Sequence, residues 1–448
     1  MTRHFHPTIT LVLAALVLTT APPMPTVQAQ PVISEHRLAN GLRVLIKDNP
    51  TTDLVAIEVL VRAAPRVEET TEAGISIFTR EVMLRGTQRR NQLEIALALE
   101  TVGGTLRALT SSEYTEWGTL TLTRHVDVAL DLLADLLSGP KFDPADVEAQ
   151  RRIQLSRIRA QADQPAARVF DLASSEIYSL HSYRNPLLGT VESVSSMTRD
   201  QIVNYYQTFY VASNMVVAIA GHVRPAVALA KVQRALGGLR SGEVPRRVRL
   251  LPAVERALAP RPSEPRQVRE VNRTAAAAAI AIAYLGVEVG HRDWAALTIL
   301  NTILGSGASS RLFAEIRDRQ GLAYTVGASF FTRAGPSTLT LTASTDPANL
   351  NRVIDAMLSE VTRLATASPT PEDLERAKNR FIGLHALSHE ELRSQAFLPA
   401  FYELLGVGYE FDRRIPDLVS VVTAADVQRV ARRYLQHPVI AVVQPPGR

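Results

Sequence analysis

The sequence predicts an α+β fold made of two homologous domains, and three observations support this prediction. The chain has 448 residues, of which 46% are hydrophobic and 21% are charged. This length exceeds what one hydrophobic core usually serves, so at least two domains are expected. From Ser34 onward, strand-like and helix-like segments alternate, and the second half of the chain repeats the order of the first.

The first half opens with strand patterns and continues with helical ones. Strand-like segments occupy residues 42–48, 54–64 and 112–124. Segments with helical spacing occupy residues 72–84, 91–103, 126–139 and 143–163. Asn40-Gly41 predicts a hairpin turn between the first strands, Gly103-Gly104 predicts a helix end, and Pro144 suits the first turn of the last helix.

Three matched pairs of segments indicate that the first half is duplicated. The pairs are residues 143–152 with 370–380, 197–210 with 422–435, and 215–223 with 438–446. Their offsets are about 227, 225 and 224 positions, although the segments belong to different element types. A constant offset across different elements predicts two copies of one α/β unit.

The matched segments set the expected domain limits. We expect an N-terminal domain over residues 30–236 and a C-terminal domain over residues 271–448. Residues 237–270 lie between them, are rich in Pro and Arg, and lack periodicity, which is typical of an interdomain linker.

Residues 1–29 resemble a secretory signal peptide. Arg3 precedes an apolar run, and small residues at Val27 and Ala29 form the expected cleavage site. The apolar run of about 14 residues is shorter than the roughly 20 needed to span a bilayer. An uncleaved anchor is the alternative. We expect an exported, periplasmic chain that is soluble after signal cleavage and has no membrane span.

Composition excludes several classes of chemistry. The chain has no cysteine, which excludes disulfides, a thiol nucleophile and cysteine-ligated metal centres. Its net charge is +5, and its arginines are interspersed with acidic residues, as in ERAKNR. This pattern predicts a mixed solvated surface and no nucleic-acid partner.

Residues 74–87, GISIFTREVMLRGT, resemble the active-site helix of the pitrilysin/insulinase metallopeptidases, whose pattern is G-x-x-H-x-x-E-H-M-L-x-x-G-T. In that family two histidines bind zinc, the intervening glutamate activates water, and a downstream glutamate completes the ligand set. Aligned on the glycines, those positions hold Ile77, Glu81, Arg80 and Arg157 in turn. Isoleucine cannot ligate a metal, and two guanidiniums oppose a dication. We therefore predict a degenerate motif without zinc, in which Glu81 pairs with an arginine.

No other convincing catalytic set stands out. His385 and His389 have i, i+4 spacing on a predicted helix, but the pattern supplies no third metal ligand. The remaining histidines of the mature chain are isolated, and residues 305–310 are glycine-rich but lack the lysine of a phosphate-binding loop. We expect this chain to bind no metal and no other cofactor.

Residues 304–330 closely resemble the C-terminal motif of the same family, G-x-x-S-R-L-F-x-x-[IL]-R-x-x-x-G-L-A-Y-x-V. The resemblance implies that Arg317 and Tyr324 complete an active site. A tyrosine hydroxyl can stabilise the oxyanion of a peptidase transition state, and a guanidinium can bind peptide carbonyls or a carboxylate. A surface arginine and a core tyrosine are the plain alternative.

The resemblance extends over nearly the whole mature chain. It implies sandwich-like domains with mixed, largely antiparallel sheets that form a clamshell. Some family members are split between a subunit with the zinc motif and a subunit with the Arg/Tyr pair. This chain resembles the second type. We therefore expect a paralogous H-x-x-E-H partner that holds the zinc, and a peptide substrate. Arg107 and Leu109 depart from the family's substrate-pairing strand, which leaves peptide engagement there open.

Two other functions remain open. The chain could be a non-catalytic structural or peptide-binding scaffold, or a separate enzyme with an unrecognised site. An Arg/Tyr pair kept in register favours the split peptidase over a scaffold. A separate enzyme would need a metal or nucleophile that the sequence does not reveal.

Overall fold

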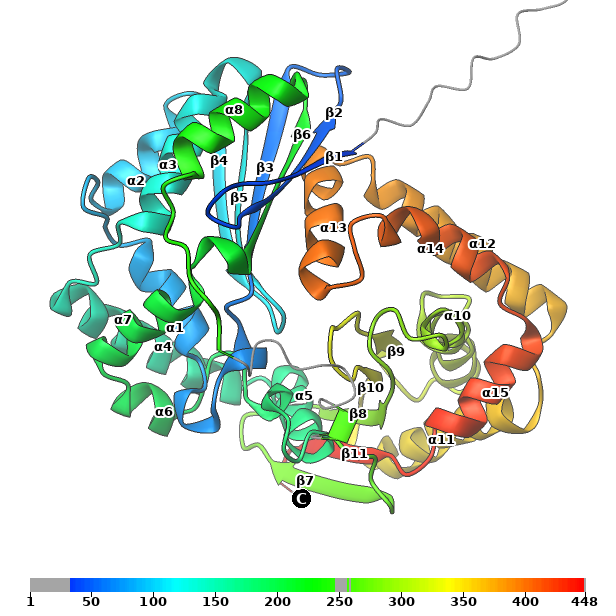
Figure 1. The fold of residues 1–448 in the computed structure, drawn as a ribbon. Helices are drawn as coiled ribbons and strands as arrows, with labels where there is room; N and C mark the ends of the chain where they lie inside the picture. The colour runs from blue at the N-terminus through cyan, green and yellow to red at the C-terminus, as the bar shows by residue number, and fades with distance from the viewer. Residues whose placement is uncertain (1–32, 246–255, 258, 447–448) are drawn as a thin grey trace, which may run out of the picture. The chain divides into compact units, whose positions relative to one another are not determined.

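Two mixed β-sheets carry the fold (Figure 1). The computed structural model describes residues 33–245, 256–257 and 259–446. The predicted signal peptide and part of the predicted linker lie outside these residues. The α+β prediction is confirmed.

The first sheet has the strand order β1-β2-β6-β3-β5-β4, and only β2 and β6 in it run parallel. Its strands are β1 (Ile33–Arg37), β2 (Arg43–Asp48), β3 (Leu54–Val61), β4 (Thr105–Thr110), β5 (Thr115–Leu122) and β6 (Met215–Gly221). The accompanying helices are α1 (Ile75–Met83), α2 (Gln92–Glu100), α3 (Val126–Ser138), α4 (Pro144–Ala162), α5 (Pro165–Ile177), α6 (Val191–Ser196), α7 (Arg199–Phe209) and α8 (Pro225–Leu236). Gly41, with φ of 91°, makes the predicted turn between β1 and β2.

The second sheet has the order β7-β11-β8-β10-β9, and only β7 and β11 in it run parallel. Its strands are β7 (Arg266–Val271), β8 (Ala278–Leu285), β9 (Thr325–Phe330), β10 (Thr338–Thr345) and β11 (Val439–Gln444). The accompanying helices are α10 (Trp294–Gly305), the π-helix η7 (Phe313–Arg319), α11 (Leu350–Thr366), α12 (Pro371–Ser388), α13 (Leu392–Leu405), α14 (Phe411–Ser420) and α15 (Ala424–Tyr434).

The two sheets are copies of one topology. The order β2-β6-β3-β5-β4 in the first corresponds strand by strand to β7-β11-β8-β10-β9 in the second. The parallel pairs agree in register: Arg43 pairs with Val216, and Arg266 pairs with Val439, each 223 positions later. The internal repeat predicted from the sequence is therefore a repeat in the structure.

Each sheet has a face covered by a helix from the other half of the chain. Helix α13 packs on β3 and β6 of the first sheet, where Ala396, Ala400 and Leu404 are buried. Helix α5 packs on β8 and β11 of the second sheet. Because both faces are covered, β8 is apolar along its whole length, and β3 is apolar except for Glu58.

Two features differ from or extend the sequence analysis. Strand β7 begins at Arg266, inside the segment predicted to be a linker, because its backbone pairs in parallel with β11. The exact domain limits stay a prediction. Among the helices of the described residues, none combines the length and the apolar character needed to cross a membrane.

Candidate functional site

The N-terminus of α1 is held by a buried carboxylate. Both oxygens of Glu68 accept hydrogen bonds from this turn, from the backbone nitrogen of Gly74 at 2.8 Å and from that of Ser76 at 3.0 Å. Burial raises the pKa of Glu68 to about 7, and these hydrogen bonds oppose the rise. Gly74 has φ of 89°, and a Cβ there would lie 2.5 Å from the carbonyl oxygen of Leu188. The glycine that opens the motif is therefore required by the backbone.

The degenerate motif forms an ion-pair cluster between α1 and α4. Glu81 Oε1 lies 2.9 Å from Arg80 Nη2 and 2.9 Å from Arg157 Nη1. Arg80 also donates through Nη1 to the carbonyl oxygen of Ala108 on β4. Ile77 is buried, with 5% of its surface exposed. The structure therefore brings Arg80, Glu81 and Arg157 together, and Glu81 pairs with both arginines.

This cluster does not fit a divalent cation. One carboxylate faces two guanidiniums, so the site already carries a net positive charge. Burial lowers the pKa of Arg80, and Glu81 opposes that shift. Ile77 offers no ligand atom. Two guanidiniums beside the single carboxylate would repel a dication, so these residues do not fit a zinc ion.

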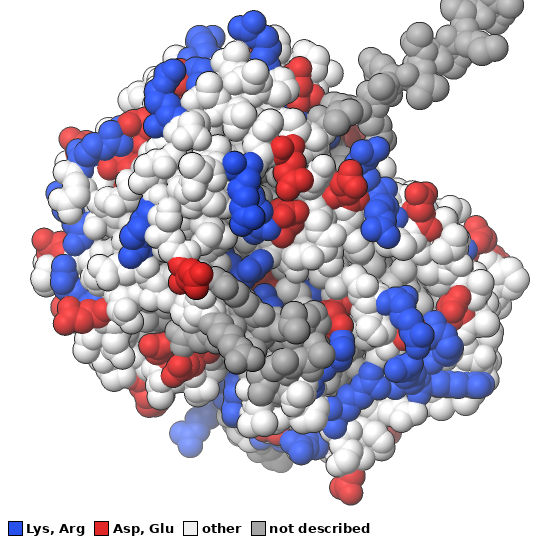
Figure 2. Space-filling model, in the orientation of Figure 1, with Lys and Arg blue, Asp and Glu red and all other residues white. Residues whose placement is uncertain are grey.

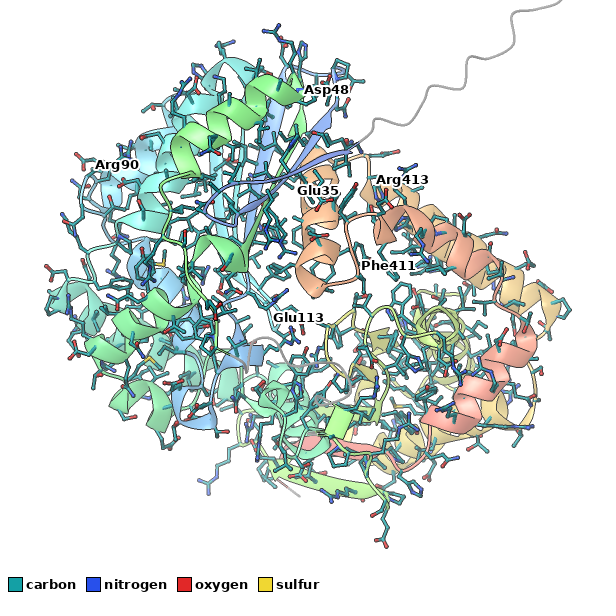
Figure 3. All side chains as sticks on the ribbon, viewed as in Figure 1. Glu35, Asp48, Arg90, Glu113, Phe411 and Arg413 are labelled. Carbon is teal, nitrogen blue, oxygen red and sulfur yellow. The ribbon has the colours of Figure 1, made fainter. Side chains whose placement is uncertain are left out.

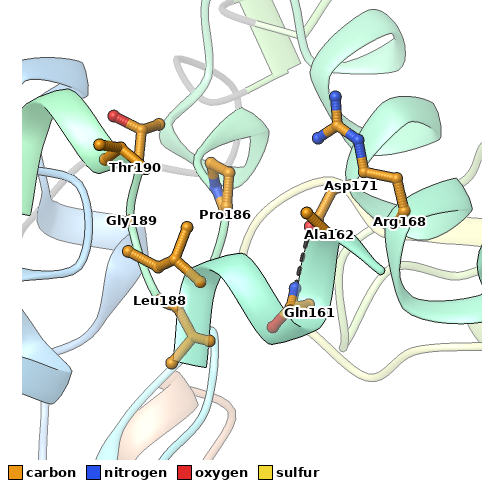
Figure 4. Close-up of a pocket in the computed structure, with 10 residues that line it drawn as sticks. Gln161, Ala162, Arg168, Asp171, Pro186, Leu188, Gly189 and Thr190 are labelled. Atoms are coloured by element: carbon orange, nitrogen blue, oxygen red, sulfur yellow. Dashed lines mark hydrogen bonds between the residues drawn. The ribbon is translucent and has the colours of Figure 1, made fainter. Parts of the chain in front are cut away.

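A small cavity is lined by residues of α4, α5 and the loop that precedes α6 (Figure 4). Its volume is about 140 Å³, and its lining includes Gln161 on α4, Asp171 on α5 and Leu188 in the following loop. Gln161 Nε2 donates to Asp171 Oδ2 at 2.9 Å, and burial raises the pKa of Asp171. Arg168, which also lines the cavity, pairs with Glu270, so the cavity's charged groups already have partners within the chain.

Arg317 lies in the π-helix η7, which packs against β9. Short π-helical segments are rare and often occur at functional sites. The Arg317 guanidinium carbon lies 4.7 Å from the centre of the Phe313 ring, and the side chain is exposed. Within the described part of the chain it forms no hydrogen bond or ion pair. Arg317 therefore presents an unpaired cation, oriented by one aromatic ring.

Tyr324 follows a tight turn and directly precedes β9. Gly321, with φ of 63°, ends the π-helix, and its backbone nitrogen donates to the Arg317 carbonyl at 3.2 Å. The Tyr324 backbone nitrogen donates to the Ser344 carbonyl at 2.8 Å, whereas the side chain is 62% exposed. Among the residues that the structure describes, its hydroxyl has no hydrogen-bond partner. The Tyr324 backbone is therefore held by a hydrogen bond, whereas its side chain extends into solvent.

The loop that ends β9 is attached to the first half of the chain. The Tyr178 hydroxyl donates to the Pro336 carbonyl at 2.7 Å and accepts from Arg333 Nη1 at 2.8 Å. The backbone nitrogen of Gly335 donates to the Tyr183 hydroxyl at 3.2 Å, and Tyr183 in turn bonds to Glu113 (Figure 3). These buried contacts hold the hairpin that Tyr324 begins.

This anchoring set has no signature in the sequence. Tyr178, Tyr183 and Glu113 are far in sequence from Arg333, and no local pattern connects them. The i, i+4 spacing of His385 and His389 is visible in the sequence, whereas Asp412, which lies close to both of them, is not. Only long-range contacts could have identified either group.

Two family models match the chain. Residues 43–191 match the model described as "Insulinase (Peptidase family M16)", and residues 196–381 match the one described as "Peptidase M16 inactive domain". An uncharacterized zinc protease of Bacillus subtilis is 28% identical over 422 residues, covering 93% of this chain and 99% of that protein. An uncharacterized zinc protease of Mycobacterium bovis is 30% identical over 420 residues, covering 91% and 92%.

Solved structures share the fold. A protease from Helicobacter pylori superposes with a TM-score of 0.87 at 19% identity, covering 93% of this chain and 100% of that chain. A peptidase M16 inactive domain from Pseudomonas fluorescens superposes with a TM-score of 0.82 at 18% identity, covering 93% and 98%. At these identities the likeness concerns the fold alone.

Proposed function

Because this chain belongs to the M16 family of insulinase-type peptidases, we propose that it is the non-zinc subunit of an exported heterodimeric metallopeptidase. In this proposal, a paralogous subunit with an intact H-x-x-E-H helix holds the zinc. This chain supplies Arg317 and Tyr324 to the peptide substrate. The apolar N-terminal run of the sequence supports export.

The contrast between the two halves carries the proposal. In the first half, Arg80, Glu81 and Arg157 pair with one another and fill the family's zinc positions. In the second half, Arg317 and Tyr324 are exposed, and neither has a polar partner among the described residues. Exposed side chains that are held by the backbone but unpaired are available to a ligand.

The chemistry of both side chains suits peptide cleavage. The Tyr324 hydroxyl can donate to the negative charge that develops on the carbonyl oxygen of the scissile peptide bond. The Arg317 guanidinium can donate two parallel hydrogen bonds to peptide carbonyls or to a terminal carboxylate. The Tyr324 contact strengthens as the negative charge develops, so its loss should lower kcat. The Arg317 contact also binds the peptide before the reaction, so its loss should raise KM.

Peptidase assays of the mature chain, alone and mixed with a paralogous H-x-x-E-H subunit from the same organism, test the proposal. We expect no activity alone and activity on mixing. Tyr324→Phe should lower kcat by about 10²–10³, the usual effect of losing one oxyanion donor. Arg317→Ala should lower kcat/KM by about 10–100-fold. Arg319→Ala is the matched control, since Arg319 lies on the same π-helix but pairs with Glu315.

The alternative is a non-catalytic scaffold of the same fold, and the same assays distinguish it. If the mixture is active and insensitive to both substitutions, the chain serves as a scaffold and the proposed roles of Arg317 and Tyr324 are wrong. Zinc-dependent activity of the isolated chain would contradict the proposal that the catalytic zinc lies on the partner subunit.

A further inference from the structure

A cluster of two histidines and an aspartate lies where α12 ends and α14 begins. His385 is in the last turn of α12 and His389 is the residue that caps it, so both rings project from one face. Asp412 lies in the first turn of α14, between Phe411 and Arg413, which are labelled in Figure 3. The ring centres of the two histidines are 4.6 Å apart.

The three potential ligand atoms converge. His389 Nε2 lies 2.6 Å from Asp412 Oδ2, and His385 Nε2 lies 3.7 Å from Asp412 Oδ1. All three residues place one ligand atom each within 4.8 Å of the others. A tetrahedral zinc ion with bonds of about 2.0–2.1 Å to nitrogen and oxygen separates its ligand atoms by about 3.3 Å. The two measured separations lie on either side of that value, so small side-chain rotations suffice.

The hydrogen bond on the far side of His389 identifies its tautomer. Nδ1 of His389 lies 2.7 Å from the His385 carbonyl oxygen, which can only accept, so Nδ1 carries a proton. In the neutral ring, Nε2 then presents a lone pair to the Asp412 carboxylate. Two acceptors at that distance, 2.6 Å between Nε2 and Oδ2, need a proton or a metal ion between them. Metal-bound histidines commonly show this arrangement, with the second ring nitrogen donating to a backbone carbonyl.

Asp412 has an unsatisfied oxygen that faces the cluster. The residue is only 4% exposed, and its Oδ1 atom is buried without a hydrogen-bond partner. A buried carboxylate oxygen without a donor is costly, and a metal ion bound at Oδ1 would satisfy it. The histidine side chains are 14% and 27% exposed, which leaves a path for an ion from solvent.

We propose that His385, His389 and Asp412 bind one divalent transition-metal ion, with zinc as the best match. This site is separate from the degenerate motif on α1, and the proposal revises the expectation that the chain binds no metal. Two imidazoles and one carboxylate suit zinc and its neighbours in the first transition row, whereas calcium and magnesium prefer sites made only of oxygen ligands. Water would occupy the fourth position. The sequence shows two of the ligands, and the tertiary structure supplies the third.

The expected effect of this ion is structural. Residues 390–411, between the histidines and Asp412, contain α13, which packs on β3 and β6 of the first sheet. An ion that joins α12 to α14 would fix both ends of this segment. Metal binding would therefore stabilise the packing of α13 against the first sheet, since binding to the folded state alone raises its stability.

Zinc binding to the untagged, metal-stripped mature chain tests this proposal, measured by calorimetry and by the melting temperature. We expect one equivalent of bound zinc and a higher melting temperature. Cobalt should give the visible absorption of a four-coordinate site. His389→Ala and the nearly isosteric Asp412→Asn should each weaken zinc binding by more than about 100-fold. Substitution of the exposed His437 by Asn is the matched control and should change nothing.

Substitution of Lys47 on β2 gives a second, independent test. Its charge interacts with Asp412 and with His389. Lys47→Met removes this competing cation and should tighten zinc binding severalfold. Absence of binding by the folded wild-type chain would overturn the proposal, because a proton alone then lies between His389 and Asp412. Unchanged binding in folded Asp412→Asn would also overturn it.

Discussion

At the residue scale, Glu81 is the carboxylate that two guanidiniums share. Its partners differ in environment: the side chain of Arg80 is 10% exposed, and that of Arg157 is 50% exposed. Breaking a buried ion pair leaves an uncompensated charge, whereas solvent screens an exposed pair. The loss of folding stability caused by a substitution in this cluster should therefore depend on which charge is left unpaired.

We predict that Glu81→Gln destabilises the chain by about 2–3 kcal/mol, because Arg80 stays buried without its counter-charge. Arg157→Ala should cost less than about 1 kcal/mol, because Glu81 keeps Arg80 and the lost arginine is half exposed. Urea unfolding of both variants measures the difference. Equal losses would mean that Arg80 does not depend on Glu81.

At the element scale, the pairing of β3 with β5 places Glu58 opposite Gly118. Glu58 is 1% exposed, and a Cβ on Gly118 would lie 2.3 Å from Glu58 Oε2. The glycine therefore makes room for a side chain on the neighbouring strand. Burial, with a smaller contribution from the Glu116 carboxylate, raises the pKa of Glu58 to about 8.

This raised pKa makes stability depend on pH. An ordinary glutamate titrates near 4.5, so between pH 4.5 and 8 the folded chain binds more protons at Glu58 than the unfolded chain. Stability is then greatest at the acidic end and falls as pH rises through this window. Glu58→Gln stays neutral and should flatten this slope, which makes the variant more stable than wild type by about 2–4 kcal/mol above pH 8.

Thermal unfolding from acidic to mildly basic pH measures that difference. Glu35→Gln, at an exposed position on β1, is the control and should follow wild type. If the melting temperatures of Glu58→Gln and wild type changed with pH in parallel, Glu58 would be ionised throughout this pH range. Glu68, whose pKa burial raises to about 7, adds a slope of the same sign to all three proteins.

At the scale of the whole molecule, the halves depend on each other because each covers a sheet of the other. Helices α13 and α5 bury apolar residues on the first and second sheets respectively. Each sheet has a core formed with residues of its own half, and it also has an apolar face that a helix of the other half covers. The surface is mixed, with basic and acidic side chains intermixed over most of the face in Figure 2.

We predict that Leu404→Ala destabilises both halves together, by about 2–5 kcal/mol. Leu404 on α13 is 1% exposed and contacts the first sheet. The chain has two tryptophans, buried Trp117 on β5 and buried Trp294 on α10, so single-tryptophan variants report each half by fluorescence. Both transitions should shift equally.

Leu387→Ala is the control, because Leu387 on α12 is 60% exposed and its loss should change stability by less than about 0.5 kcal/mol. A shift confined to the Trp294 signal would show that the halves fold separately.

Local patterns in the chain were enough to predict the repeat, the strands and helices named above for the first half, and the pairing of Glu81 with an arginine. Element periodicity and a constant offset depend on neighbours along the sequence, and the structure confirms both in its two corresponding sheets. The absence of a ligand atom at Ile77 is a property of the residue type, so no structure was needed to predict it. The roles of Arg317 and Tyr324, which derive from a motif, remain a prediction.

Tertiary structure decided which distant residues meet. Glu81 on α1 pairs with Arg157 on α4, and Arg333 in the second half bonds to Tyr178 in the first. Asp412 lies close to His385 and His389. Strand β7 also depends on a partner, β11, at the far end of the chain. Such contacts arise from packing between segments far apart in sequence, and the pattern within each segment carries no record of its partner. The same reason explains why two ligands of the proposed metal site are visible in the sequence and the third is not.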